Sequence, residues 1–268
     1  MENGQARLKS DVLATEEPME IRLLAGDKTQ TVAVTMRTPG ADFELAAGFL
    51  YGEGIVGSPD DIMKISYCVD PEIDAEQQYN IVNIELRGNK EYDLRSLERH
   101  FYTTSACGVC GKASLEQLEL RDCPVIPQGP VVSAEIITSL PGKLRETQNL
   151  FDSTGGLHAA ALFDAEGNLV ALREDVGRHN ATDKLVGWAL LEGGLPLSDH
   201  VVMVSGRSSF EILQKCLNAG VPVVCAISAP SSLAVDVARR FGITLVGFLR
   251  GERFNVYAGK ERIKLQET

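Results

Sequence analysis

The second half of the chain carries the stretch that decides the fold: Val201-Val202-Met203-Val204, followed by Ser205-Gly206-Arg207-Ser208-Ser209. Four apolar residues without alternation are typical of a strand that is buried on both faces. Ser208 and Glu211 form a capping-box pattern, which predicts a helix that starts here and stops at Gly220. The stretch therefore predicts a buried strand, a polar loop at its carboxyl end, and a helix.

The same order of strand, polar loop and helix follows downstream. Val221–Ile227 is a second apolar run, Ser231 opens a helix that stops at Gly242, and Ile243–Leu249 is a third run. Arg253–Tyr257 predicts a last strand. Because apolar strands that alternate with capped helices are typical of parallel strands covered on both sides, we expect an α/β fold.

The elements before Val201 are expected from weaker patterns. Two hairpins are predicted, Met19–Leu24 with Thr31–Met36 and Leu157–Phe163 with Leu169–Glu174. Helices are predicted at Asp42–Tyr51, Ala134–Leu140, Pro141–Leu150 and Asn180–Leu191, and a strand at Tyr79–Leu86. We expect a smaller α+β domain over residues 1–130 and the α/β core over residues 131–268.

The composition limits the partners of the protein. The 268 residues carry a net charge of −11, so the surface as a whole repels nucleic acid and anionic membranes. An anionic ligand therefore needs a local cluster of arginines and backbone amides. The N-terminus has no apolar signal-peptide core and no apolar run reaches the roughly 18–20 residues of a membrane span, so we expect a cytoplasmic protein. In the cytosol thiols stay reduced.

Polar loops follow the three apolar strands, and parallel strands bring such loops to one edge of a sheet. They read Ser205-Gly206-Arg207-Ser208-Ser209, Ser228-Ala229-Pro230-Ser231-Ser232 and Arg250-Gly251-Glu252-Arg253. Helix capping alone would also explain the serines and glycines at these positions. Arginines together with helix N-termini favour a phosphate- or nucleotide-bearing ligand at this edge.

Four residues outside the last loop are assigned to this site from their place at the expected sheet edge. Ser205 and Arg207 follow the first strand, and Asp175 and His179 lie just before the start of another helix.

The first half contains a second candidate for chemistry, Cys107-Gly108-Val109-Cys110-Gly111-Lys112, followed by an apolar run from Ala113 to Leu120. A thiol at a helix N-terminus and beside a lysine has a lowered pKa, and the thiolate is its reactive form. The pattern therefore indicates sulfur chemistry at Cys107 and Cys110.

Three readings of this CxxC pattern stay open from the residues alone: a zinc site completed by His100 or Cys123, a thioredoxin-like dithiol, and a nucleophilic thiolate. A zinc deaminase is disfavoured, because its H-x-E and P-C-x-x-C signatures are not met. Here the CxxC precedes His158, Ala160 stands at the position of the glutamate, and Ala106 stands at that of the proline.

Several further motifs lie in order along the chain. They are Arg37-Thr38-Pro39-Gly40, Glu44-Leu45-Ala46-Ala47-Gly48-Phe49-Leu50, Cys107-Gly108-Val109-Cys110-Gly111, Gly155-Gly156-Leu157-His158-Ala159-Ala160, Arg173-Glu174-Asp175-Val176-Gly177-Arg178-His179-Asn180, Ser205-Gly206-Arg207 and Phe248–Tyr257. With them the chain resembles the FdhD family, the formate dehydrogenase accessory sulfurtransferases.

The resemblance implies a homodimer with a cytidine-deaminase-like three-layer core. We expect no permanently bound metal. It implies a sulfurtransferase and chaperone that takes persulfide sulfur from a cysteine desulfurase and passes it to the molybdenum bis(molybdopterin guanine dinucleotide) cofactor of formate dehydrogenase. Cys107 matches the persulfide-carrying cysteine, with Cys110 as its neighbour. The segment that binds the guanine dinucleotide is matched by Phe248, Leu249, Arg250, Gly251, Glu252 and Arg253. The competing hypothesis is a non-catalytic cofactor chaperone whose CxxC holds zinc.

Overall fold

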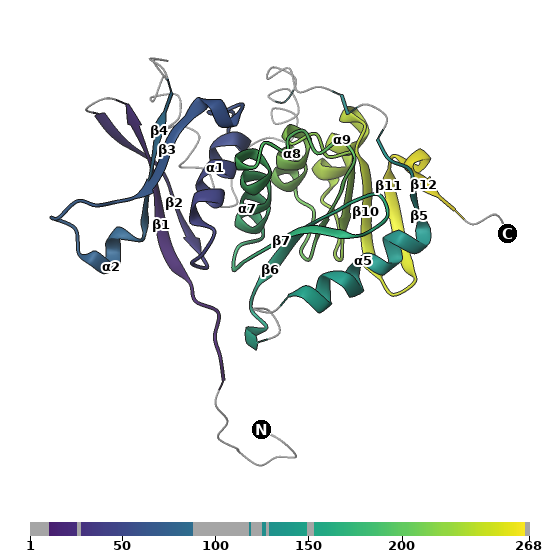
Figure 1. Cartoon of the computed structure of the whole chain (residues 1–268). Coiled ribbons are helices and arrows are strands. Elements are labelled where there is room, and N and C mark those ends of the chain that lie inside the picture. The colour runs from purple at the N-terminus through teal and green to yellow at the C-terminus, as the bar shows by residue number, and fades with distance from the viewer. Residues whose placement is uncertain are drawn as a thin grey trace, which may run out of the picture.

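Two β-sheets lie side by side, with helices α1 (Asp42–Gly52) and α7 (Arg178–Leu191) packed between them (Figure 1). The structure is a computed structural model that describes residues 11–25, 28–87, 118, 125–126, 129–148 and 153–265. Within these ranges, no helix is both long enough and apolar enough to cross a membrane.

The first sheet has four strands in the order β2-β1-β4-β3. They are β1 (Glu17–Ala25), β2 (Lys28–Arg37), β3 (Ile62–Tyr67) and β4 (Ile81–Leu86), with the short elements η1 (Pro59–Asp61) and α2 (Ala75–Gln78) between them. The predicted β1–β2 hairpin is confirmed, and β1 also pairs in parallel with β4. Met19, Ile21 and Leu23 are buried at every second position of β1, so one face of the sheet packs on α1.

The second sheet has six strands in the order β11-β10-β9-β8-β6-β7. They are β6 (His158–Phe163), β7 (Leu169–Asp175), β8 (Val201–Val204), β9 (Val223–Ala226), β10 (Thr244–Arg250) and β11 (Arg253–Ala258). The expected parallel strands are β8, β9 and β10. The outer strands are antiparallel, because β6 pairs antiparallel with both β7 and β8, and the tight turn after β10 reverses the chain into β11.

Helices cover both faces of this second sheet. One face packs against α7, α8 (Phe210–Asn218) and α9 (Ser232–Phe241), and the other against α5 (Ala134–Thr147). The strand residues alternate accordingly: Val202 belongs to the first of these cores and Met203 to the second. The expected burial of the strands on both faces is confirmed, and the protein is a mixed α/β protein.

The two helices predicted to meet at Pro141 are one helix, α5, which contains Pro141 in its interior. The prediction was wrong because the buried face of Ile137, Leu140 and Leu144 continues past the proline and packs on the sheet. This packing offsets the roughly 3 kcal/mol that an interior proline costs a helix. The short strand β5 (Val132–Ser133) precedes α5 and pairs with β12 (Ile263–Lys264), which follows η2 (Lys260–Arg262).

The predicted helix caps were right for one helix and wrong for two. In α9, the Ser231 side chain accepts a hydrogen bond from the Ala234 N–H, as expected. The N-cap of α8 is Ser209, not Ser208, and it makes no side-chain capping bond. Helix α7 starts two residues before the predicted Asn180, whose side chain instead bonds outside the helix.

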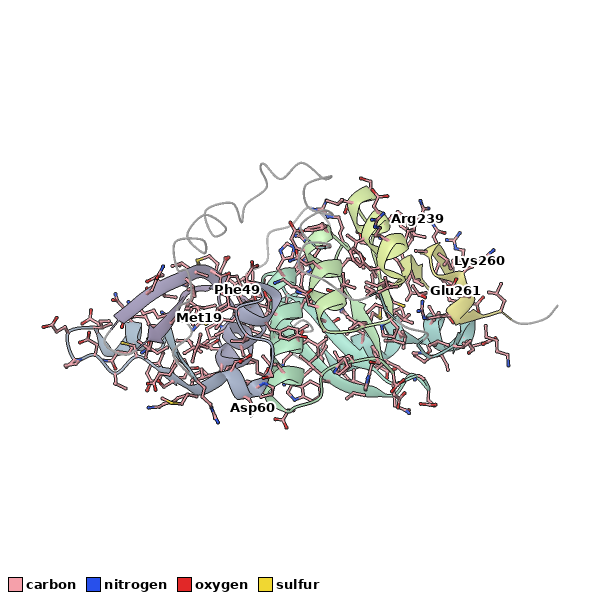
Figure 2. All side chains as sticks on the ribbon, turned by 90° about the horizontal axis from the view of Figure 1, so that it is seen from above. Met19, Phe49, Asp60, Arg239, Lys260 and Glu261 are labelled. Atoms are coloured by element: carbon pink, nitrogen blue, oxygen red, sulfur yellow. The ribbon has the colours of Figure 1, made fainter. Side chains whose placement is uncertain are left out.

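The two sheets are joined by unusually close helix packing. Gly48 of α1 and Gly187 of α7 face each other so closely that a Cβ atom on Gly187 would lie 2.7 Å from the Gly48 nitrogen. Met19 and Phe49 lie in the half of the molecule that contains the first sheet and α1, and Arg239 and Lys260 lie in the other half (Figure 2). The domain boundary expected at residue 130 stays a prediction. Helix α1, which precedes this boundary, packs closely against α7, which follows it.

Candidate functional site

The loops at the carboxyl ends of β8, β9 and β10 touch one another. The Ser231 N–H donates to the Ser208 carbonyl at 2.9 Å, and the Phe248 N–H donates to the Ser228 carbonyl at 3.1 Å. Ser208 and Pro230 also form a single parallel β-bridge. The prediction that these three loops meet at one edge of the sheet is therefore confirmed.

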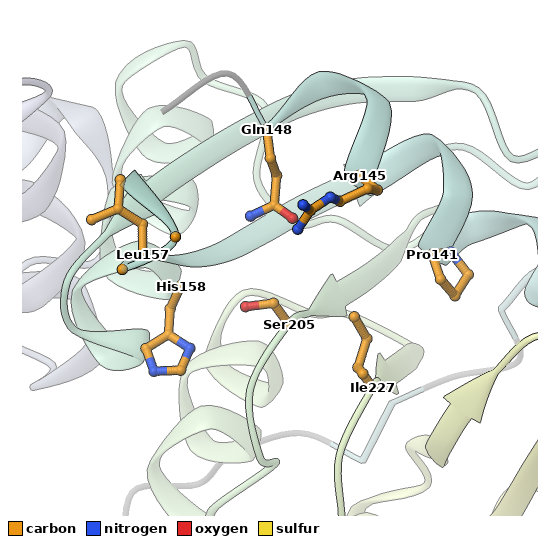
Figure 3. A pocket seen from close by; sticks show the side chains of 9 residues that line it. Pro141, Arg145, Gln148, Leu157, His158, Ser205 and Ile227 are labelled. Atoms are coloured by element: carbon orange, nitrogen blue, oxygen red, sulfur yellow. The ribbon is translucent and has the colours of Figure 1, made fainter. Parts of the chain in front are cut away.

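A pocket of about 460 Å³ opens beside this edge, between α5 and the strand ends (Figure 3). Its lining combines polar side chains with apolar walls and comprises Pro141, Arg145, Gln148, Gly155, Gly156, Leu157, His158, Ser205 and Ile227. Of the residues assigned to the site from sequence, the pocket includes Ser205. His158 belongs to the Gly155–Ala160 motif named in the sequence analysis, whereas Arg145, at the end of α5, and Gln148, its C-cap, were not singled out from sequence.

Ser205 and His158 present hydrogen-bonding groups to the pocket. The Ser205 Oγ accepts a hydrogen bond from the Ala159 N–H at 2.9 Å, which leaves its own O–H group to donate. Burial lowers the pKa of His158, and the positive charges of Arg178 and His179 lower it further. The imidazole is therefore neutral at pH 7 and offers one N–H donor and one acceptor.

Gly206 allows two basic side chains to approach each other behind the pocket. A Cβ at this position would lie 3.3 Å from His158 Nδ1 and 3.4 Å from Arg178 Cδ. The buried Nε of Arg178 has no hydrogen-bond partner in the part of the chain that the structure describes. Within the described ranges, Arg178 therefore has one buried N–H group that no protein acceptor satisfies.

The Asp175 side chain contacts other residues of the protein and does not line the pocket. Its carboxylate is fully buried, lies 2.7 Å from Lys184 Nζ, and accepts hydrogen bonds from the Thr38 N–H and the Gly177 N–H. Asn180 Nδ2 donates to the same carboxylate at 3.0 Å. Asp175 therefore ties the first sheet to the β7–α7 loop, and we assign it to the support of the site rather than to ligand contact.

His179 and Arg207 lie at the same edge of the sheet without lining the pocket. His179 Nε2 lies 3.2 Å from Ser209 Oγ and 3.7 Å from the Glu211 carboxylate. This contact fixes the N-terminus of α7 against that of α8. Arg207 is exposed.

The β10–β11 turn separates its residues into exposed and buried positions. Phe248 has a φ of 52° and is 43% exposed, an unusual backbone conformation for a residue with a large side chain. The β10–β11 pairing is irregular between Gly247 and Arg250, and Leu249 points into the core. Arg250, Gly251, Glu252 and Arg253 are exposed, so five of the six residues in the Phe248–Arg253 segment are accessible.

The predicted catalytic residues, Cys107 and Cys110, lie outside the described residues, as do His100 and Cys123. Three other cysteines are described and all are buried: Cys68, Cys216 and Cys225. Burial raises the pKa of Cys216 and of Cys225 to about 12, so both thiols are protonated and unreactive at neutral pH. No group of metal-ligating side chains occurs in the parts of the chain that the structure describes.

The fold and the site define a mixed α/β protein with a pocket beside the carboxyl ends of the parallel strands of a mixed sheet. A sequence model of the FdhD/NarQ family matches residues 14–264. The chain therefore belongs to the FdhD/NarQ family.

Individual relatives match over nearly the whole chain. A protein of Streptomyces avermitilis named Sulfur carrier protein FdhD is 53% identical over 266 residues, which span 98% of this chain and 93% of that protein. A protein of the same name from Sulfurisphaera tokodaii is 47% identical over 97% of this chain and 95% of its own length. A crystal structure assigned as a formate dehydrogenase accessory protein from Desulfotalea psychrophila has a TM-score of 0.71 and 27% identity, and covers 95% of this chain and 91% of that one.

Proposed function

We propose that this protein is a sulfur carrier that supplies sulfur to the cofactor of a formate dehydrogenase. The observation that carries the proposal is the match to relatives named sulfur carrier proteins at about half identity over nearly the full length, in a chain that contains the Cys107–Cys110 pair. The similarity to a formate dehydrogenase accessory protein supports the identity of the recipient.

The first chemical step is the loading of Cys107. Its thiolate attacks the terminal sulfur of a persulfide on a cysteine desulfurase. A new sulfur–sulfur bond forms on Cys107, the bond to the donor cysteine breaks, and the donor leaves as a thiolate. No oxidant is required, because the transferred sulfur keeps its oxidation state.

The second step is the release of the sulfur. The Cys110 thiolate attacks the inner sulfur of the Cys107 persulfide, a Cys107–Cys110 disulfide forms, and the terminal sulfur leaves as sulfide. The two thiols supply the two electrons that reduce the transferred sulfur. The sulfide is delivered to the molybdenum bis(molybdopterin guanine dinucleotide) cofactor, which is cargo and not a resident group.

The carboxyl edge of the six-stranded sheet is the proposed binding site for the cofactor. The exposed Arg250 and Arg253, together with Arg207, provide positive charge for the diphosphate of a guanine dinucleotide. We also propose that the six-stranded sheet is a cytidine-deaminase-like core. Its three layers, with α5 on one face and α7, α8 and α9 on the other, support this assignment.

The proposed partners are a cysteine desulfurase as donor, the catalytic subunit of a formate dehydrogenase as recipient, and a second copy of the chain in a homodimer. Light scattering at several protein concentrations tests the homodimer.

The decisive experiment is mass spectrometry of the intact protein after incubation with a cysteine desulfurase and cysteine. We expect one added sulfur on Cys107, none in Cys107→Ala, and loading without efficient release in Cys110→Ala. Cys216 and Cys225 serve as internal controls, because their buried, protonated thiols should stay unmodified. A stoichiometric zinc ion in the purified protein, with no sulfur on Cys107, would instead establish the non-catalytic chaperone.

A further inference from the structure

The corner between β2 and α1 has an unusual backbone conformation. Gly40 has a φ of 107° and Ala41 has a φ of 55°, a left-handed conformation that costs free energy in a residue with a side chain. Such a conformation persists only where the surrounding contacts fix it. The contacts that this corner makes therefore indicate what it contributes to the protein.

A buried arginine fixes the corner on the side of the first sheet. Arg37 Nε and Nη2 each donate to a carboxylate oxygen of Asp42 at 3.0 Å. Nη2 also donates to Asn80 Oδ1 at 3.0 Å, and the Tyr67 hydroxyl donates to the Asp42 carboxylate at 3.2 Å. Because a bidentate, charge-assisted pair holds a defined geometry, the residues between Arg37 and Asp42 are fixed at both ends.

Thr38 lies inside this corner and directs all of its polar groups to the second sheet. Its N–H donates to the Asp175 carboxylate at 3.1 Å, and its carbonyl accepts from Lys184 Nζ at 2.8 Å. Its Oγ1 accepts from the Val176 N–H at 3.1 Å. Asp175 ends β7, Val176 lies in the β7–α7 loop, and Lys184 lies on α7. Thr38 therefore contacts this loop and both elements that flank it.

The β7–α7 loop leads directly to two basic residues at the carboxyl edge of the six-stranded sheet. Arg178 and His179 open α7. Arg178 and His158 both lie against Gly206, and His179 Nε2 lies 3.2 Å from Ser209 Oγ. Burial lowers the pKa of His158, and the charges of Arg178 and His179 lower it further. The titration of His158 therefore reports where the loop holds these two residues.

We propose that Thr38 is a positioning residue, which holds the β7–α7 loop so that Arg178 and His179 lie beside His158 at the carboxyl edge of the sheet. Thr38 is buried and does not line the pocket, so it acts through these side chains. The inference rests on the proposed function in one respect, because that function makes this edge the binding site for the cofactor. It adds that a residue next to the first sheet sets the geometry of an edge formed by the second.

The test removes the hydroxyl of Thr38 and keeps the shape of the side chain. In Thr38→Val the Val176 N–H loses its acceptor, so its amide hydrogen should exchange about tenfold faster in the full chain. The pKa of His158, followed by NMR, should rise toward its ordinary value of 6.5, because Arg178 moves away and water reaches the ring. Thr38→Ser keeps a hydroxyl acceptor and should behave like the wild type in both measurements.

A matched control removes a buried threonine hydroxyl elsewhere. Thr244 is fully buried at the first residue of β10, away from the carboxyl edge, and its Oγ1 donates to the Gly259 carbonyl at 2.8 Å. Thr244→Val should lower the melting temperature as Thr38→Val does, but the pKa of His158 should not change. This comparison separates a positioning role from a general loss of stability.

A variant at a weaker contact decides the question if Thr38→Val does not fold. Thr35 Oγ1 donates to Asn180 Oδ1 at 3.3 Å, which is a second hydrogen bond from β2 to the start of α7. Thr35→Val should raise the pKa of His158 in the same direction and by a smaller amount. An unchanged His158 titration in this variant would then overturn the inference.

Three further results would overturn it: an unchanged His158 titration in folded Thr38→Val, an equal shift in Thr244→Val, or failure of Thr38→Ser to restore the wild-type titration. Loading of sulfur on Cys107 should be unchanged in Thr38→Val, and a parallel loss of loading would refute a role confined to the sheet edge. The titrations require neither sulfur nor cofactor. They therefore test Thr38 even if the wild type takes up no sulfur and the carrier function fails.

Discussion

The contact between α1 and α7 predicts the effect of adding a single methyl group. In Gly187→Ala, the new Cβ would overlap the Glu44 carbonyl oxygen and lie 2.7 Å from the Gly48 nitrogen, below the 3.0 Å that real Cβ contacts respect. Both neighbours are backbone atoms of α1, which cannot turn aside as a side chain can. The helices must therefore separate, and with them the two sheets.

The expected loss of stability follows from two opposing contributions. Overpacking of a tight contact costs up to about 3 kcal/mol, whereas replacing glycine by alanine inside a helix gains about 1 kcal/mol. The net effect of Gly187→Ala is a destabilisation of about 2 kcal/mol, which corresponds to a decrease of about 5 °C in melting temperature for a chain of this size.

The assay is thermal unfolding followed by circular dichroism, with Gly142→Ala as the matched control. Gly142 lies within α5 and a Cβ there meets no atom within 4 Å, so only the helix gain remains and this variant should be stabilised by about 1 kcal/mol. If Gly187→Ala were as stable as Gly142→Ala, the close approach of α1 and α7 would be refuted.

Two further predictions concern buried and half-buried charges. Lys184→Met leaves the Asp175 carboxylate without its ion-pair partner and should lower the free energy of unfolding, measured in urea, by about 3 kcal/mol. The double variant with Asp175→Asn should regain part of this loss. An unchanged urea midpoint in Lys184→Met would contradict the buried pair. The hydrogen bond with His179 lowers the pKa of Glu211 to about 2, below its ordinary value of 4.5. The stability from this shift is present above pH 4.5 and is lost as the pH falls toward 2, so Glu211→Gln should flatten the acid limb of the stability curve. The effect should stay below about 1 kcal/mol because the carboxylate is more than half exposed, and an acid limb identical to that of the wild type would argue against the pair.

The strands and hairpins were predictable because their signals are local. Val201–Val204 and Val223–Ala226 are apolar at every position, and burial on both faces is the state that such runs favour. Ser231 and Gly242 bracket α9 as expected, since a side-chain cap and a left-handed terminal residue depend only on adjacent backbone.

The errors occurred where tertiary packing opposes a local preference. Pro141 signals a break, but the apolar face of α5 is buried against the sheet and keeps the helix continuous. Asn180 suits a helix cap, but its side chain bonds to the Met36 carbonyl in the first sheet and to Asp175, so Gly177 caps α7 instead. The Met36 carbonyl lies 144 residues away in the sequence, so no local pattern reveals this bond.

The sequence alone determined the buried strands of the core and the edge where three polar loops meet, because each depends on residues close together in the chain. The assignment of sulfur chemistry to Cys107 and Cys110 stays a prediction from the sequence. Only the tertiary structure showed that Asp175 is a buried support and that Arg145, Ser205 and His158 line the same pocket. The physical reason is that both results depend on how α5 and the first sheet pack against the second sheet. No local pattern of residues encodes that contact.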